Sequence, residues 1–104
     1  MMKRICVFCG SRAGHDERHR DAAAALGRRL AANGQTLVFG GGSVGLMGVI
    51  ADAVLAEAGE VIGVIPRALA TKELQHPGVV DMRRVADMHA RKALMAELAD
   101  GFIA

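Results

Sequence analysis

Glycine is concentrated in the segment FGGGSVGLMG, which follows the apolar run QTLVF and precedes a segment with helical character. Its glycines are Gly40, Gly41, Gly42, Gly45 and Gly48. The first, third and fourth of these fit the pattern G-x-G-x-x-G between a strand and a helix. Glycines let the backbone approach a phosphate closely, and the start of a helix offers unpaired N–H groups. The segment therefore predicts a phosphate-binding turn, and a tight turn that needs glycine for packing alone is the alternative.

The residues in and after this turn limit which nucleotides the predicted site could bind. A dinucleotide-binding fold places Asp or Glu near the end of the next strand, whereas the run EVIGVIP is followed by Arg67. NAD is therefore disfavoured, and a P-loop is excluded because the turn lacks Gly-Lys-Ser/Thr. An NADP oxidoreductase that uses Arg67 to hold the 2'-phosphate stays open as a further hypothesis.

Another glycine and a hydroxyl, Gly10 and Ser11, follow the apolar run RICVFC near the N-terminus. The carboxyl ends of parallel strands meet at one edge of a sheet, and ligands bind outside that edge. If the first run forms a strand close to the strand that precedes Gly40, both turns face one crevice. Gly10 and Ser11 are therefore candidate ligand-binding residues.

Arg91 occurs on an otherwise apolar helical stripe in DMHARKALMAELAD. The apolar members of the stripe are Met88, Leu94, Met95 and Leu98. At about 100° per residue, Arg91 falls in the middle of their arc. A guanidinium among core positions requires an anion, which is either a structural ion-pair partner or a ligand phosphate or carboxylate. Arg91, and Lys92 at the edge of the stripe, are therefore candidate binding residues, with a structural ion pair as the alternative.

Two patterns that resemble metal or redox sites are interpreted as structural. Cys6 and Cys9 form C-x-x-C, but strand residues three apart point to opposite faces, and no second cysteine pair completes a zinc site. His15 and His19 resemble the H-E-x-x-H helix, but Asp16 occupies the place of the glutamate. We therefore expect no metal site.

These residues must be positioned by elements that alternate along the chain. Strand-length apolar runs are found at residues 4–9, 36–40, 60–66, 79–85 and 101–104, and helical segments at 16–32, 45–59 and 87–100. The alternation predicts an α/β fold, with a parallel sheet flanked by helices on both faces. The irregular stretch 66–78 follows a strand and is a candidate site loop.

The first two helical segments differ in their apolar pattern. The first carries one apolar stripe, formed by Ala22, Ala23, Leu26 and Leu30. Asn33 and Gly34 supply its left-handed stop. The second segment is apolar on nearly all sides and ends at Gly59, so we expect it to be buried with neighbours on more than one side.

Composition limits the class of protein. A chain of 104 residues with 52% apolar and 23% charged residues predicts one globular domain over residues 1–104. The net charge of +2 comes from scattered arginines, and 3% of residues are aromatic, so we expect no nucleic-acid partner. No stretch approaches the roughly twenty apolar residues of a membrane span, and the N-terminal run is too short for a secretion signal. We therefore expect a cytoplasmic location and no membrane partner.

The chain stops at DGFIA, an apolar run that is expected to be a central strand. A domain rarely ends on such a strand, so we expect a chain truncated after its fifth strand. The unpaired edge of that strand would make the fragment prone to association.

The segments VFCGSR, GGGSVGLMG, VIP and MHARKALM occur together in the order and spacing of one family. Over essentially its whole length, the chain resembles the LONELY GUY (LOG) family of cytokinin riboside 5'-monophosphate phosphoribohydrolases, often mislabelled as lysine decarboxylases. The resemblance implies a Rossmann-like nucleotide-binding sheet, homodimers or larger homo-oligomers, and no cofactor. The implied reaction hydrolyses the N-glycosidic bond of AMP or N6-prenylated AMP, giving a free base and ribose 5-phosphate.

The resemblance also implies roles for individual residues. Glu73 in TKEL, Arg91 and Lys92 match substrate-binding positions, with Arg91 catalytic, and Gly40 to Gly48 match the nucleotide turn. The family signature P-G-G-x-G-T-x-x-E, which supplies phosphate-binding glycines and the catalytic carboxylate, is absent from this sequence. We therefore expect hydrolysis by the full-length protein and no activity from these residues alone. A non-catalytic nucleotide-binding or carrier module is the alternative function.

Overall fold

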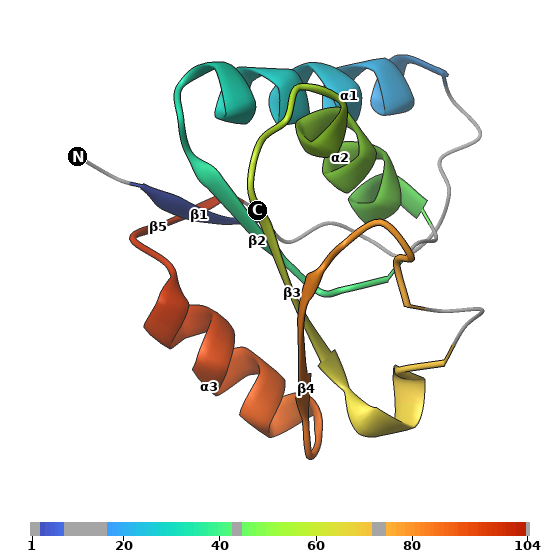
Figure 1. Cartoon of the computed structure of the whole chain (residues 1–104), viewed down its shortest axis with the longest axis vertical. Coiled ribbons are helices and arrows are strands. Elements are labelled where there is room, and N and C mark those ends of the chain that lie inside the picture. The colour runs from blue at the N-terminus through green and yellow to red at the C-terminus, as the bar shows by residue number, and fades with distance from the viewer. Residues whose placement is uncertain (1–2, 8–16, 43–44, 72–74, 104) are drawn as a thin grey trace.

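Within the residues that the computed structural model describes, 3–7, 17–42, 45–71 and 75–103, five parallel strands form one sheet (Figure 1). The strands are β1 (Arg4–Val7), β2 (Thr36–Phe39), β3 (Val61–Pro66), β4 (Asp81–Val85) and β5 (Gly101–Ile103). Their order across the sheet is β4-β3-β2-β1-β5, and every neighbouring pair is parallel. The predicted parallel α/β sheet is confirmed.

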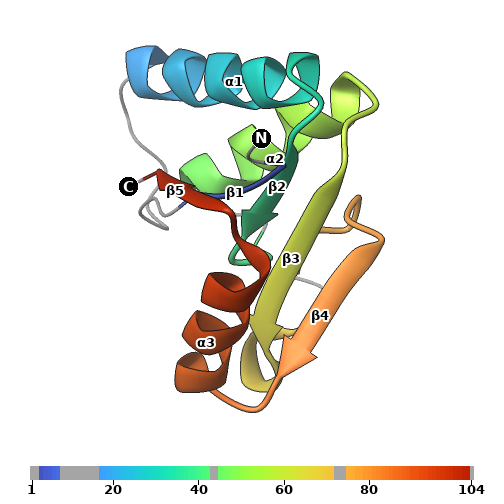
Figure 2. The same ribbon diagram turned by 90° about the vertical axis from the view of Figure 1, so that its left-hand side faces the viewer.

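Helices cover both faces of this sheet, as the sequence predicts. Helices α1 (Glu17–Ala32) and α2 (Gly45–Ala56) lie on one face, and α3 (Met88–Leu98) lies on the other, as Figure 1 and Figure 2 show. The strand order advances from β1 to β4 and then returns to place β5 beside β1. Right-handed crossovers therefore put the helices of the outward path on one face and the helix of the return path on the other. No helix in the described part of the chain has the length and hydropathy needed to cross a membrane.

Alternation along the strands divides the core into two layers. Ile5 and Val7 of β1 pack with α1 and α2, whereas Cys6 between them packs with α3. In β2, Phe39 belongs to the first layer and Val38 to the second. Successive strand residues point to opposite faces, so each of these strands contributes to both layers. A sheet covered on both faces explains why its strands read as continuous apolar runs.

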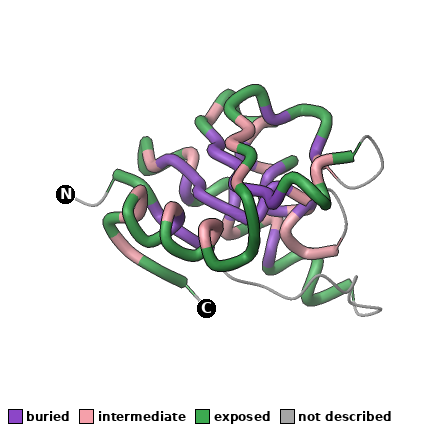
Figure 3. The backbone as a smooth tube through the Cα atoms, turned by 90° about the horizontal axis from the view of Figure 1, so that it is seen from below, coloured by how far each residue is buried: buried purple, intermediate pink, exposed green. Residues whose placement is uncertain are grey.

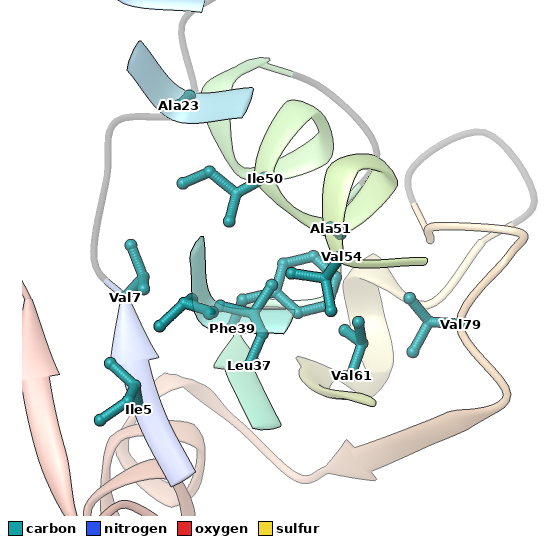
Figure 4. Packing of buried hydrophobic residues seen from close by; sticks show 11 residues of the cluster. Ile5, Val7, Ala23, Leu37, Phe39, Ile50, Ala51, Val54, Val61 and Val79 are labelled. Atoms are coloured by element: carbon teal, nitrogen blue, oxygen red, sulfur yellow. The ribbon is translucent and has the colours of Figure 1, made fainter. Parts of the chain in front are cut away.

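Helix α2 packs against α1 and against the sheet. Its residues Ile50, Ala51 and Val54 are buried, and they lie over Leu37 and Phe39 of β2 in the close view of Figure 4. Figure 3 shows that buried positions gather in the interior while the outward sides of the helices are exposed. The predicted burial of the second helix on more than one side is confirmed.

Helix α1 ends as the sequence predicts, whereas helix α2 ends earlier than predicted. The backbone after α1 turns left-handed at Gly34, with φ +67°, as expected. Helix α2 ends at Ala56 instead of at Gly59, and the backbone after it turns left-handed at Ala58, with φ 58°. The helix therefore ends three residues earlier than expected, and an alanine adopts the left-handed conformation that glycine, having no Cβ, usually adopts.

The buried stripe of α1 also differs from the expected one. Its buried residues are Ala23, Gly27 and Leu30, whereas Ala22 is exposed. Gly27 lies against α2, and Ala22 is five residues away from it, which is about 140° of helical rotation. Because Gly27 is in close contact with α2, the buried stripe of α1 is centred near Gly27, and Ala22 lies outside it.

Strand β4 begins later than expected. It starts at Asp81, where it pairs with Ile62 of β3, instead of at residue 79. Val79 is buried in the core layer that contains residues of α1 and α2, whereas Val80 is fully exposed. The chain therefore uses Val79 to cover the core before the strand begins.

We expect Gly27→Ala to destabilise the protein. A Cβ at residue 27 would lie 2.6 Å from the carbonyl oxygen of Ile50 and 2.7 Å from Cβ of Ala53. Alanine is the better helix former by about 1 kcal/mol, but relieving this overlap means moving two helices apart, and overpacking costs about 1–3 kcal/mol. Urea unfolding should show a lower midpoint for this variant, while Arg28→Ala at an exposed position of α1 should change it little. A midpoint raised by Gly27→Ala would contradict the packing described.

We expect Cys6 to be unreactive in the folded protein. Burial raises the pKa of its thiol to about 11. Because the thiolate is the reactive form, alkylation at pH 8 should be on the order of 100-fold slower than for a cysteine with an ordinary pKa. Peptide mapping after iodoacetamide treatment should find Cys6 labelled only when denaturant is present. Equal labelling in the folded and unfolded protein would contradict its burial.

Candidate nucleotide-binding site

Arg91 and the described glycines that follow β2 lie near the carboxyl edge of the sheet. Gly40 directly follows β2, the short 3-10 helix η1 (Arg67–Leu69) follows β3, and α3 begins shortly after β4. Asp87 caps α3, because its side chain accepts a hydrogen bond from the backbone N–H of Ala90 at 2.8 Å. The first turn of α3 is therefore held at the same edge as the glycine turn. In open α/β sheets this edge is where ligands bind.

The strands β1 and β2 are neighbours in the sheet. The sequence predicts that the turns after these two strands face one crevice if the strands lie close together. The closeness of the strands is confirmed. Gly10 and Ser11, which follow β1, lie outside the described residues, and so does Glu73.

Arg91 reaches from α3 across the ends of β2 and β3. Its Nε donates a hydrogen bond to the carbonyl oxygen of Val64 at 2.9 Å, and Nη2 donates to the carbonyl oxygen of Gly40. Its Nη1 lies 3.5 Å from the sulfur of Met88. Met88 itself is exposed, so the expected apolar stripe of α3 does not continue into the core at that residue. The structure thus brings the predicted arginine and the first glycine of the predicted turn into direct contact.

The electrostatic surroundings of Arg91 are unusual for a half-buried cation. Burial lowers the pKa of its guanidinium below the ordinary value. Ion pairs within the described residues include His76 with Asp52 and Arg83 with Asp81, and no described carboxylate pairs with Arg91. Backbone carbonyls are therefore its described acceptors, and the structural ion pair considered from the sequence is not found in this part of the chain. A positive charge held by neutral acceptors is suited to an anionic ligand.

The glycine turn is shaped by its backbone and by its neighbours. Gly41 has φ +82° and Gly45, the first residue of α2, has φ +77°, values that side chains rarely tolerate. At Gly40 a Cβ would lie 2.1 Å from Nη2 of Arg91. Gly42 pairs in an antiparallel bridge with Gln75, and Gly48 is buried within α2. Glycine is therefore needed in this turn for its conformation and for the approach of Arg91.

His76 is a site residue that the sequence did not single out. It is 5% exposed, its Nε2 lies 2.6 Å from Oδ1 of Asp52, and its backbone N–H donates to the carbonyl oxygen of Gly41 at 2.8 Å. It lies within the stretch 66–78, which the sequence predicts to be a site loop. No short motif joins it to Asp52, because the two residues lie 24 positions apart.

The other predicted residues lie near the surface. Lys92 is exposed on α3 next to Arg91, and Arg67 is exposed in η1. His19 is exposed in the first turn of α1, whereas His15 and Cys9 lie outside the described residues. Among the residues that are described, no group of three or more His, Cys, Asp or Glu side chains is placed to hold a metal ion.

Two hollows of the surface lie at opposite edges of the sheet. One of about 440 Å³ is lined by residues where the strands begin, among them Arg4, Thr36 and Asp81. The other, of about 380 Å³, adjoins the glycine turn through Gln75, and its lining also includes Thr71 and Arg84. Among the described residues, the lining of the second hollow includes neither Arg91 nor a glycine of the turn, so Gln75 is its link to the turn.

The amino-acid sequence matches one protein-family model and a set of curated relatives. The sequence model of a family described as "Possible lysine decarboxylase" matches residues 47–104. Cytokinin riboside 5'-monophosphate phosphoribohydrolase LOG1 of Arabidopsis thaliana is 52% identical over 102 residues, which cover 98% of this chain and 48% of that protein. The enzyme named LOG of Oryza sativa subsp. japonica is 49% identical over 102 residues, covering 98% and 42%. The chain therefore spans about half the length of the curated relatives it matches.

Solved structures share the fold at lower sequence identity. The molybdenum cofactor carrier protein of Chlamydomonas reinhardtii superposes with a TM-score of 0.80 at 24% identity, over 98% of this chain and 61% of that chain. The molybdenum cofactor binding protein of Rippkaea orientalis gives 0.78 at 19% identity, over 100% and 64%. At these identities the likeness shows a common Rossmann-like fold and nothing about the ligand.

Proposed function

Since the chain belongs to the LONELY GUY family, whose sequence model is described as "Possible lysine decarboxylase", we propose that the full-length protein is a nucleoside 5'-monophosphate phosphoribohydrolase. It hydrolyses the N-glycosidic bond of AMP or an N6-modified AMP and releases the base and ribose 5-phosphate. The observation that carries the proposal is the contact between Arg91 and Gly40, which joins a half-buried cation to a glycine turn. The names of the relatives that are about half identical support the type of reaction.

The glycine turn and α2 are proposed to hold the 5'-phosphate. The first N–H groups of a helix have no acceptor within the helix, and the helix dipole places partial positive charge at that end. Gly45 begins α2, and Gly40 to Gly42 lead into it from β2. A phosphate held there supplies binding energy away from the bond that breaks. Gly48, one turn into α2, and the hydroxyl of Ser11 with Gly10 belong to the same proposed binding surface.

Arg91 is proposed as the catalytic residue of this chain. In the reaction, water adds to C1' of the ribose, the bond to the base nitrogen breaks, and the base leaves with a proton. Positive charge develops on the ribose in the transition state, so a carboxylate beside the sugar lowers the barrier. A guanidinium close to that carboxylate keeps it ionised, and it can exchange its carbonyl acceptors for charged oxygens, which form stronger hydrogen bonds.

The carboxylate itself is not assigned to these residues. The signature P-G-G-x-G-T-x-x-E does not occur among the 104 residues, and the relatives are about twice as long as the matched region. The reaction is therefore proposed for a protein that includes that signature. Glu73 is proposed to accept hydrogen bonds from the ribose or base, and Lys92 to bind substrate beside Arg91.

The proposal is tested by product analysis with the full-length protein. AMP and N6-isopentenyl-AMP are incubated with enzyme, and base and ribose 5-phosphate are quantified by chromatography. We expect equimolar amounts of the two products, and no cadaverine from lysine in a parallel reaction. Cadaverine without base release would overturn the assignment. Bound AMP without any product would favour the non-catalytic carrier, and a fluorescence change on titration with NADPH would favour a dinucleotide enzyme.

We also propose a homo-oligomeric, cytoplasmic protein. The free, buried Cys6 is compatible with a reducing compartment. Light scattering of the full-length protein should give a mass of two or more chains, and a monomer at micromolar concentration would contradict the oligomer.

A further inference from the structure

The carbonyl groups of the glycine turn are held by two different elements. Arg91 of α3 donates to the carbonyl oxygen of Gly40, and the backbone N–H of His76 donates to that of Gly41 at 2.8 Å. The bridge between Gly42 and Gln75 extends the second contact by one residue. The segment around His76 therefore lies directly against the backbone that is proposed to bind phosphate.

The ring of His76 is fixed on both of its nitrogens. Nδ1 accepts a hydrogen bond from the backbone N–H of Gly78 at 3.0 Å, so the proton lies on Nε2, which donates to Oδ1 of Asp52 at 2.6 Å. The ring also packs in a T-shaped arrangement with that of Phe39, with centroids 6.3 Å apart and planes at 81°. Phe39 is the last residue of β2, immediately before Gly40. The histidine thus connects α2, the end of β2 and the turn.

Asp52 holds this ring from the surface. Its side chain is 72% exposed, whereas that of His76 is 7% exposed. Removal of the carboxylate therefore opens no cavity in the core, but it leaves the buried Nε2–H without its acceptor. An unpaired buried donor is costly, so the ring and its backbone are expected to move toward water.

We propose that His76, fixed by Asp52, is a positioning residue that sets the backbone of Gly41 and Gly42 for phosphate binding. The proposal rests on the proposed function, because the phosphate ligand is part of it. His76 touches no reacting atom in this assignment and acts through the turn. A purely structural role would change stability alone and leave substrate affinity as it was.

The matched pair Asp52→Ala and Asp52→Asn tests the proposal in the full-length protein. The amide oxygen of Asn can still accept from Nε2, whereas Ala cannot. For Asp52→Ala we expect KM for AMP to rise by about three- to tenfold, with kcat within about twofold because Arg91 is untouched. The inhibition constant of inorganic phosphate should rise by the same factor as KM. Asp52→Asn should stay within about twofold of the unmodified protein in each constant.

A second measurement separates failure of this proposal from failure of the proposed function. Hydrogen exchange of the His76 amide, which is bonded to Gly41, should be faster in Asp52→Ala than in Asp52→Asn. This readout applies even if the protein hydrolyses no nucleotide. Unchanged exchange together with unchanged KM would overturn the positioning role, as would a lower melting temperature with unchanged KM. Equal losses in both variants would show that the hydrogen bond from Nε2 is not what fixes the turn.

Discussion

Arg91→Ala is expected to lower the rate of base release from AMP by about 100- to 1000-fold in the full-length protein, which stays folded. Loss of one preorganised charged donor from an active site has an effect of this order. The side chain is half-buried and its described acceptors are backbone carbonyls, so its removal leaves no carboxylate unpaired among the described residues. We expect unfolding to become easier by only about 1–3 kcal/mol through the lost hydrogen bonds.

Single-turnover rates and circular dichroism of the same preparations check this prediction. Arg91→Lys keeps the charge but lacks the planar fork that reaches Val64 and Gly40 together, so it should recover only part of the rate. Arg29→Ala, at an exposed position of α1, is the control for loss of an arginine. If Arg91→Ala unfolds the protein while its folded fraction keeps full activity, Arg91 is a structural residue.

Gly40→Ala is expected to reduce activity by a similar order, with a loss of stability no larger than that of Arg91→Ala. The backbone of Gly40 is not in the left-handed region, so alanine is not excluded by conformation. Its Cβ would lie 2.1 Å from Nη2 and 2.9 Å from Cζ of Arg91, which is the far end of a flexible side chain. The guanidinium is therefore displaced before the backbone moves, and the reaction loses the same group as in Arg91→Ala.

A double-mutant cycle provides the control for Gly40→Ala. If both substitutions act through the guanidinium, the double variant should be no slower than Arg91→Ala alone, because groups that act as a unit are not additive. Losses that multiply would show that Gly40 acts independently of Arg91. A melting temperature for Gly40→Ala that is no lower than that of Arg91→Ala completes the expected result.

Local patterns in the sequence were sufficient to predict the strands, the helices and the sheet that they form. Runs such as TLVF and VIGVIP are continuous because both faces of the sheet are covered, and that continuity is visible without a structure. Arg91 was identified because a charge on an apolar stripe departs from the helical period. The pattern gave its place on α3 but not the acceptors it meets, since Gly40 and Val64 are brought to it by other elements.

Contacts between distant residues could not be predicted from one sequence. The pair of His76 with Asp52 depends on how the connection between β3 and β4 packs against α2, and no residue spacing encodes that. The end of α2 shows the same limit on a smaller scale. Ala58 adopts the left-handed conformation although the next residue is glycine, because the backbone N–H groups of Ala58 and Gly59 close on Leu55 and Val54.

In the proposed site, Arg91 and the glycine turn bind the phosphate of a nucleotide. The most direct test compares kcat/KM of the full-length protein for AMP and for adenosine in one assay of base release. A phosphate held by charge-assisted hydrogen bonds adds about 3 kcal/mol or more to transition-state binding, so we predict at least about a 100-fold preference for AMP. Equal values for AMP and adenosine would contradict the claim.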